Sequence, residues 1–142
     1  MSDDEKRLHP SPPKPDETGF ETVHFADSQV IFQEGEVGDA AYLISLGKVE
    51  IRKGMKTSNP QTLAVLGHGD IFGEMALFDD SPRMAEAIAR SNVELIAINR
   101  EEFNRRLDAS DPVMRTISLY LVNRVRDMAN QFMRRKEPVW TK

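Results

Sequence analysis

The sequence contains no cysteine, and this absence excludes several kinds of chemistry. A disulfide framework, a thiolate metal site and a cysteine nucleophile are all unavailable to the chain. Histidine is almost as scarce, because only His9, His24 and His68 occur, scattered between the N-terminal stretch and turns. Metal-dependent catalysis needs histidine and carboxylate ligands that cluster in space. We therefore expect neither a metal site nor an enzyme.

Long hydrophobic runs are also missing. No apolar stretch approaches the length of a membrane span, and the start "MSDDEKR" lacks the basic and then apolar layout of a signal peptide. The formal net charge of -4 argues against a general binder of nucleic acids or of anionic membranes. We therefore expect a cytoplasmic protein that does not associate with a membrane.

The composition divides the 142 residues into a tail and one domain, residues 20–142. Residues 1–19 are charged and rich in proline, with almost nothing to bury, so we expect a disordered or extended tail. From residue 20 to about residue 98, short apolar runs rich in valine, isoleucine and phenylalanine alternate with glycine. This rhythm predicts an all-β sandwich or barrel.

The pattern changes to a helical period over residues 99–136. Asn99 is expected to cap a first helix, and Asp111, followed by Pro112, a second one. The second helix carries apolar residues spaced by three and four, at Met114, Ile117, Leu121, Val125, Met128 and Phe132. Further apolar residues widen this surface, so we predict a homodimer joined through the helix. The alternative is an ordinary amphipathic helix that covers the β domain.

The stretch "FGEMALFDDSPRMAEA", residues 72–87, carries the chemistry. Gly73 lets the backbone approach a ligand closely, and the helical turn that follows would aim amide N–H groups at an anion. Arg83 can bring a guanidinium fork to the same anion. Glu74 would repel a bare phosphate, but it could accept a hydrogen bond from the hydroxyl of an attached ribose. A nucleotide satisfies both conditions; the alternative is an internal ion pair between Glu74 and Arg83.

At these residues the sequence resembles the cyclic nucleotide-binding domain family. The phosphate-binding cassette of that family reads roughly F-G-E-[LM]-A-L, then a few turn residues, then P-R-x-A. Here it stands at residues 72–77 and 82–85. Glycine-marked strands on either side extend the resemblance over about residues 22 to 135. The resemblance implies a mainly β fold, an eight-stranded antiparallel β-roll of the jelly-roll type with C-terminal α-helices.

The resemblance also implies roles for the cassette residues. Arg83 pairs with the exocyclic oxygens of the cyclic phosphate, while Glu74 and Gly73 hold the ribose 2′-hydroxyl. The backbone amides expected to complete the phosphate cradle are those of Met75, Ala76 and Ala85.

The base of the nucleotide is expected to lie between apolar side chains and a lid. Ile51 and Leu66 fall where the family lines the purine, and Phe72 and Met84, next to the cassette glycine and arginine, complete the expected binding set. The second half of the final helix is where the family places its lid, here at Arg124, Met128 and Asn130.

Met84 and Glu86, which follow Arg83, both depart from the family pattern. Family members commonly have Ser or Thr where this sequence has Met84, or Thr where it has Glu86. The missing hydroxyl at Met84 predicts cyclic AMP as the ligand in preference to cyclic GMP. Glu86 should point to solvent, because it alternates with an inward Ala85 on a strand. If it pointed inward, it would oppose an anionic ligand.

Together these observations predict a sensor without a cofactor other than its nucleotide. Ligand binding would rearrange the C-terminal helix, and an unidentified downstream protein would read the change. The sequence stops at Lys142, soon after the long helix, so we expect no DNA-binding domain. One alternative is a degenerate pocket retained as a dimerisation or protein-docking module, as Met84 and Glu86 suggest. Another is a metal-dependent cupin enzyme, against which the scattered histidines argue.

Overall fold

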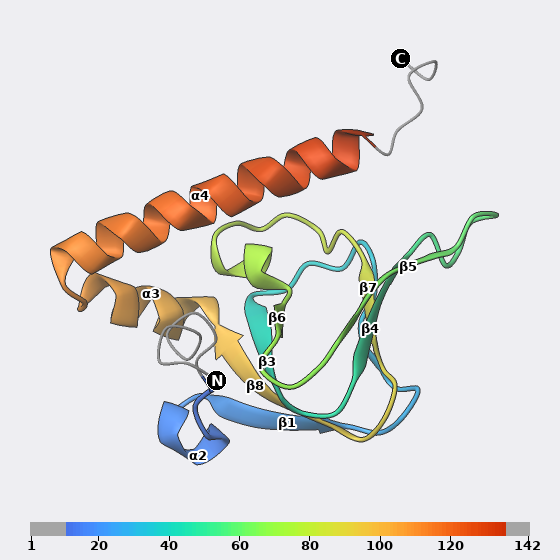
Figure 1. Cartoon of the computed structure of the whole chain (residues 1–142), viewed down its shortest axis with the longest axis horizontal. Coiled ribbons are helices and arrows are strands. Elements are labelled where there is room, and N and C mark those ends of the chain that lie inside the picture. Colours follow the sequence, from blue (N-terminus) through green and yellow to red (C-terminus); the bar gives the residue numbers. More distant parts are fainter. Residues whose placement is uncertain (1–10, 136–142) are drawn as a thin grey trace, which may run out of the picture. The chain divides into compact units, whose positions relative to one another are not determined.

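The computed structural model describes residues 11–135, with side chains up to residue 128 (Figure 1). The strands in this range are β1 (Glu21–Phe25), β2 (Val30–Phe32), β3 (Ala40–Leu46), β4 (Val49–Lys53), β5 (Gln61–Leu66), β6 (Ile71–Phe72), β7 (Glu86–Ala89) and β8 (Val93–Asn99). The helical elements are α2 (Pro15–Thr18), the 3-10 helix η1 (Glu74–Leu77), α3 (Arg100–Asp108) and α4 (Pro112–Arg135).

The eight strands form two four-stranded sheets. Their strand orders are β1-β8-β3-β6 and β2-β7-β4-β5, and every neighbouring pair is antiparallel. In the first sheet, Leu95 of β8 lies opposite both Val23 of β1 and Ile44 of β3. The predicted mainly β fold, an eight-stranded antiparallel β-roll with C-terminal helices, is confirmed.

The hydrophobic core lies between the two sheets. Because strand side chains alternate between faces, every second residue of a strand points into this space. Both sheets contribute to the buried cluster, which contains Phe32, Ile44, Val49, Phe72, Ala87, Ala89, Val93 and Leu95. The central strands β3 and β8 are buried on their other face as well, at Leu43 and Ile96. This double burial explains why "YLISL" and "ELIAI" read as nearly continuous apolar runs.

Residues 15–18 differ from the expectation of a disordered tail over residues 1–19. Pro15 takes the first helical position of α2, and the Glu17 carboxylate accepts a hydrogen bond from the Lys14 N–H at 3.4 Å. Gly19 ends the turn with a left-handed φ of 74°. Composition records only how little this stretch can bury, whereas these local caps stabilise one helical turn without a core.

The C-terminal helices begin at the predicted caps. The Asn99 side-chain oxygen accepts a hydrogen bond from the Glu102 N–H at 2.8 Å, and that of Asp111 accepts from the Val113 N–H at 2.9 Å. The chain divides into two compact units, one up to Phe103 and the other from Asn104. In the part of the chain that the structure describes, no helix has the length and apolar character needed to cross a membrane.

Candidate functional site

The cassette segment begins where β6 ends. Gly73 has a left-handed backbone, with φ 71°, and the chain then turns into η1. This conformation favours glycine because a Cβ would crowd the following carbonyl oxygen. Ala76 and Leu77 of η1 are buried, and the Ala76 N–H donates to the Gly73 carbonyl oxygen at 3.2 Å. This amide, expected in the phosphate cradle, therefore already has a partner within the turn.

The Arg83 guanidinium is the central charge of the segment. Its Nη1 donates to the Gly73 carbonyl oxygen at 3.1 Å, and its Nη2 donates to the Ala40 carbonyl oxygen at 2.7 Å. Its Cζ lies 4.2 Å from the centroid of the Phe32 ring, which is a cation–π contact. Burial lowers the pKa of Arg83, and the negative groups around it partly oppose that change. The side chain stays charged at neutral pH, since an arginine pKa starts far above it.

Two glycines give the guanidinium its space. A Cβ added at Gly38 would lie 2.6 Å from Nη2 of Arg83, and one added at Gly73 would lie 2.7 Å from Nη1. Real side-chain carbons do not approach so closely, so any larger residue would displace the arginine. In the sequence Gly38 looks like an ordinary turn glycine, and only the structure reveals this contact.

The backbone of Arg83 is held by the connection between β2 and β3. The Gly35 N–H donates to the Arg83 carbonyl oxygen at 2.8 Å, and the Arg83 N–H donates to the Glu36 carbonyl oxygen at 2.7 Å. Both ends of the arginine residue, its backbone and its guanidinium, are therefore fixed by main-chain groups. Such anchoring reduces the entropy lost when the side chain binds an anion.

An aromatic cluster lies beneath the guanidinium. The Tyr42 ring stacks on Phe72 with centroids 5.4 Å apart, and Phe32 lies 6.2 Å from Tyr42 and 5.9 Å from Phe72. Burial raises the pKa of the Tyr42 hydroxyl. Of these three rings, the sequence argument named only Phe72. Tyr42 lies opposite Phe72 in the β3–β6 register, whereas Phe32 belongs to the other sheet, so the sequence carries no local signal for this cluster.

Glu74 follows the cassette glycine and is only partly buried. Its carboxylate acts on the pKa of Arg83 through its charge, yet no ion pair between the two occurs within residues 11–135. The alternative of an internal Glu74–Arg83 ion pair is therefore not what the structure contains. Both side chains keep hydrogen-bonding capacity for a ligand.

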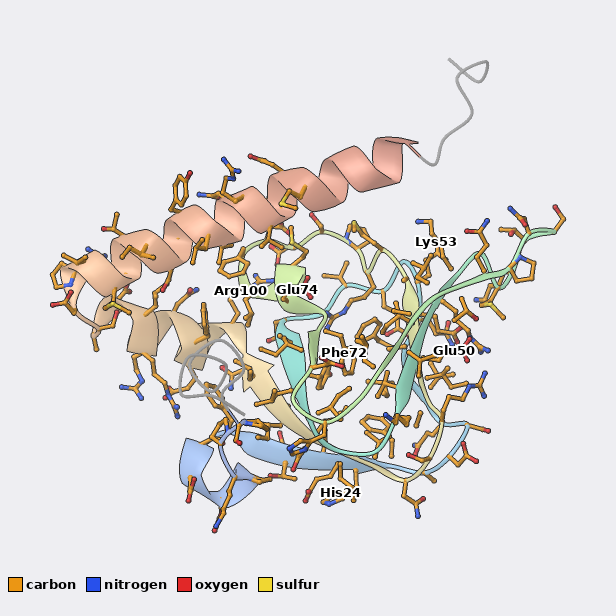
Figure 2. All side chains as sticks on the ribbon, in the orientation of Figure 1. His24, Glu50, Lys53, Phe72, Glu74 and Arg100 are labelled. Atoms are coloured by element: carbon orange, nitrogen blue, oxygen red, sulfur yellow. The ribbon has the colours of Figure 1, made fainter. Side chains whose placement is uncertain are left out.

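Arg100, the first residue of α3, donates hydrogen bonds to η1 and to the turn that follows it. Its Nε donates to the Ala76 carbonyl oxygen at 2.7 Å and its Nη2 to the Asp79 carbonyl oxygen at 2.7 Å. Its Nη1 pairs with the Asp80 carboxylate at 2.6 Å. Figure 2 shows Arg100 and Glu74 beside η1. Arg100 was missed from the sequence, because it lies 24 residues from its partner Ala76.

Of the other predicted residues of the first unit, Met75 lies in η1, Ile51 and Leu66 lie in the second sheet, and Met84 and Ala85 directly precede β7. Ile51 and Leu66 pack against the buried core, and Ile51 lies opposite Ala87 in the β4–β7 register. Ala85 is partly buried. The Met84 side chain is 39% exposed, and its carbonyl oxygen accepts a hydrogen bond from Lys53 Nζ at 3.1 Å. The structure thus places Met84 at the surface end of the cassette.

Glu86 lies on the outer face of β7, because Ala87 and Ala89 occupy the face that points into the core. There its carboxylate pairs with Arg52 Nε at 2.8 Å, and its side chain is 12% exposed. Glu86 is therefore turned away from the core as expected, although it faces an arginine and not open solvent.

The predicted lid residues belong to the second unit. Arg124 lies with its Cζ 6.0 Å from the Tyr120 ring centroid on the same helix, and Met128 is exposed. The side chain of Asn130 lies outside the described residues. Their assignment to a lid stays a prediction.

Among residues 11–135, no group of three or more histidine, aspartate and glutamate side chains is arranged to hold a metal ion.

Comparison with known proteins identifies the family. The sequence pattern of the family described as "Cyclic nucleotide-binding domain" matches residues 22–110. The cyclic AMP receptor protein of Thermus thermophilus is 33% identical over 108 residues, which cover 76% of this chain and 50% of that protein. A cAMP-dependent protein kinase regulatory subunit from Pyricularia oryzae is 33% identical over 96 residues, 68% of this chain and 24% of that protein. The chain belongs to the cyclic nucleotide-binding domain family, and it spans half or less of these relatives.

Solved structures give the same result for the fold. The EAL enzyme Bd1971 in its cAMP-bound form superposes with a TM-score of 0.61 at 34% identity, covering 80% of this chain and 30% of that one. Its cGMP-bound form gives a TM-score of 0.62 at 34% identity, covering 78% and 30%. The similarity therefore concerns one domain of a larger enzyme.

We predict that Gly38→Ala destabilises the protein through Arg83. The added methyl group should cost about 1 kcal/mol, since it overpacks a filled site from which only the guanidinium can move. Urea denaturation of Gly38→Ala, Arg83→Ala and the double variant would measure the coupling. In the Arg83→Ala background the cost of Gly38→Ala should disappear. An equal cost in both backgrounds would show that the methyl group meets something else.

Proposed function

We propose that this chain binds a cyclic nucleotide and acts as a regulatory, non-catalytic sensor. The observation that carries the proposal is the seating of Arg83. Two of its five N–H donors are used on the carbonyl oxygens of Gly73 and Ala40, so three are left for the oxygens of a phosphate. Names of relatives support the ligand class, since they include a cyclic AMP receptor protein and a cAMP-bound structure.

The proposed binding mode follows the cassette. The guanidinium of Arg83 would donate to the exocyclic oxygens, which is the planar, two-point recognition that arginine provides and lysine does not. Glu74, which is not neutralised by Arg83, would accept a hydrogen bond from the ribose 2′-hydroxyl. Ile51 and Leu66 would contact the base from the apolar side of the sheet. The lid from α4 and the resulting rearrangement of that helix complete the proposed signal, which a downstream protein would read.

The orientation of Glu86 supports this function over a degenerate docking module. That alternative rested on Met84 and on the risk that Glu86 would repel an anion. Because Glu86 pairs with Arg52 on the outer face of β7, its charge is compensated away from the core side of the strand. Met84 is then the one departure still relevant to the ligand.

We predict micromolar or tighter binding of cyclic AMP by the purified chain, equivalent to at least about 8 kcal/mol. Arg83→Ala should remove roughly 2–5 kcal/mol, because the phosphate would lose its charged hydrogen bonds. Arg83→Lys should restore only part of the affinity, since an ammonium group cannot fork. Isothermal titration calorimetry measures all three.

Arg90→Ala is the matched control for Arg83→Ala. Arg90 directly follows β7, and its Nε pairs with Glu50 at 2.6 Å. The substitution therefore removes a guanidinium charge outside the cassette. It should bind like wild type. Equal binding by wild type and Arg83→Ala would contradict the cassette assignment.

We further predict a preference for cyclic AMP over cyclic GMP. The Met84 side chain has no strong donor or acceptor, so a guanine amino group buried against it would lack a partner. That loss costs roughly 1–3 kcal/mol, and we expect a preference on the order of ten-fold or more, which corresponds to at least about 1.4 kcal/mol. Competition of both nucleotides against one fluorescent analogue measures the ratio. Met84→Thr should shift it toward cyclic GMP, and an unchanged ratio would show that Met84 does not set the choice.

Finally, we propose a homodimer joined through α4. Large apolar side chains on this helix are exposed in the single chain, including Leu121 at 55% and Met128 at 63%. A sustained apolar surface of this kind is buried when two helices pack together.

Light scattering on the full chain should give the mass of a dimer, and Leu121→Glu with Met128→Glu should give a monomer. Leu46→Glu with Val65→Glu is the matched control, since these strand residues are also exposed, at 60% and 62%. Its mass should equal that of wild type. The same mass for the α4 variant and for wild type would overturn the α4 interface.

A further inference from the structure

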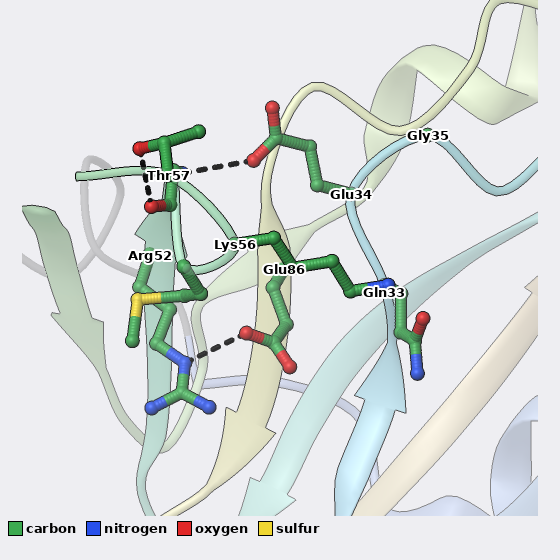
Figure 3. A pocket seen from close by; sticks show the side chains of 9 residues that line it. Gln33, Glu34, Gly35, Arg52, Lys56, Thr57 and Glu86 are labelled. Atoms are coloured by element: carbon green, nitrogen blue, oxygen red, sulfur yellow. Dashed lines mark hydrogen bonds and ion pairs between the residues drawn. The ribbon is translucent and has the colours of Figure 1, made fainter. Parts of the chain in front are cut away.

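A cavity of about 500 Å³ lies on the outer side of the second sheet, at the base of the β4–β5 hairpin (Figure 3). Its lining residues are Gln33, Glu34, Gly35, Arg52, Gly54, Met55, Lys56, Thr57 and Glu86. They come from the β2–β3 connection, from β4, from the hairpin turn and from β7. The cavity is within the size range of small-molecule pockets. The cassette does not explain it, because Arg52 and Glu86 alternate with residues that face the core.

The acidic groups of the cavity are already engaged by the protein. Glu86 accepts from Arg52 Nε at 2.8 Å, and Figure 3 shows the two side chains pointing toward one another. Glu34 accepts from the Gly54 N–H at 2.9 Å, and its other oxygen lies 3.8 Å from Lys53 Nζ. Neither carboxylate therefore presents an uncompensated negative charge to a ligand.

The cationic groups, in contrast, keep donors unused. Within residues 11–135, Arg52 makes its hydrogen bond through Nε alone, so the edge formed by its two Nη atoms is left without a partner. The Arg52 side chain is 18% exposed, which limits its hydration. Lys56 is exposed, and its ammonium group makes no hydrogen bond or ion pair in the same range. The cavity thus offers the Nη edge of a guanidinium whose charge Glu86 balances through Nε, together with an ammonium group that has no carboxylate partner in the described range.

The wall formed by the β4–β5 turn is held in place by its own hydrogen bonds. Gly54 has a left-handed φ of 73°, and its carbonyl oxygen accepts from both the N–H and the hydroxyl of Thr57, at 3.0 and 2.7 Å. This turn holds Met55, which is 41% exposed and offers an apolar contact. A preformed pocket with an apolar side and a few directed donors suits a small ligand.

We propose that this outer cavity binds a small organic anion through a carboxylate or phosphate group, at a site separate from the cassette. The anionic group would receive the two Nη donors of Arg52 and the ammonium group of Lys56, and its carbon body would contact Met55. The proposal does not depend on cyclic nucleotide binding, since none of these side chains belongs to the cassette.

The test is an NMR titration of the full ¹⁵N-labelled chain. The chemical shifts of the backbone amides of Gly35, Gly54 and Thr57 report binding. Succinate, inorganic phosphate and the neutral succinamide are the three probes. We expect saturable shifts with at least one anion, with a Kd on the order of 1 mM, and none with succinamide. Comparing succinate with phosphate tells which anionic group the site prefers. The shifts should persist in Arg83→Ala, which separates this site from the cassette.

Three variants assign the site to its residues. Arg52→Gln should weaken binding about ten-fold or more, because it removes the fork. Lys56→Gln should weaken it several-fold, and it leaves the fold intact because Lys56 bonds nothing in the described part. Arg90→Gln is the matched control, since Arg90 pairs with Glu50 through the same atom but lies outside the cavity lining. Absence of saturable shifts with both anions, or retained affinity in Arg52→Gln and Lys56→Gln, would overturn the proposal.

Discussion

The seating of one guanidinium on two backbone carbonyl oxygens is the contact on which the site depends. Arg83 joins the end of β6, through Gly73, to the start of β3, through Ala40, and it lies over the Phe32 ring of β2. Removing such a charge from water costs several kcal/mol unless strong partners replace the lost hydration. Two carbonyl dipoles and an aromatic face provide that replacement, and they also aim the remaining donors.

This constraint explains why two glycines lie beside the arginine. A side chain at Gly38 or Gly73 would have no room beside the guanidinium, and Ala87 and Ala89 are fully buried in the core cluster with Phe32 and Phe72. Large side chains at these places would compete with Arg83 or with the aromatic cluster for the same volume. The cassette glycine, Gly73, therefore has a steric cause here.

Strand β7 separates two kinds of environment within a few residues. Its inner face joins the hydrophobic core, while its outer face carries Glu86, which pairs with Arg52 of the neighbouring strand. A similar pair joins Glu50 to Arg90, and the pKa of Glu50 is lowered by hydrogen bonds from Thr62 and Arg90. Charges on the outer face are thus balanced between neighbouring strands. Glu86, which departs from the family pattern, has Arg52 as its partner.

The sequence by itself determined the main features of this protein. Glycine-punctuated apolar runs indicated an all-β sandwich or barrel, and Asn99 and Asp111 marked the helix starts. Residues 72–85 identified the family and, through it, the β-roll. These signals are local in the chain. Only the tertiary structure revealed the partners of Arg83, the support from Arg100 and the pairing of Glu86. Backbone carbonyl oxygens such as that of Ala40 have no signature in a sequence, since every residue carries one. Contacts between residues 24 to 43 positions apart exist only once the strands have been brought together.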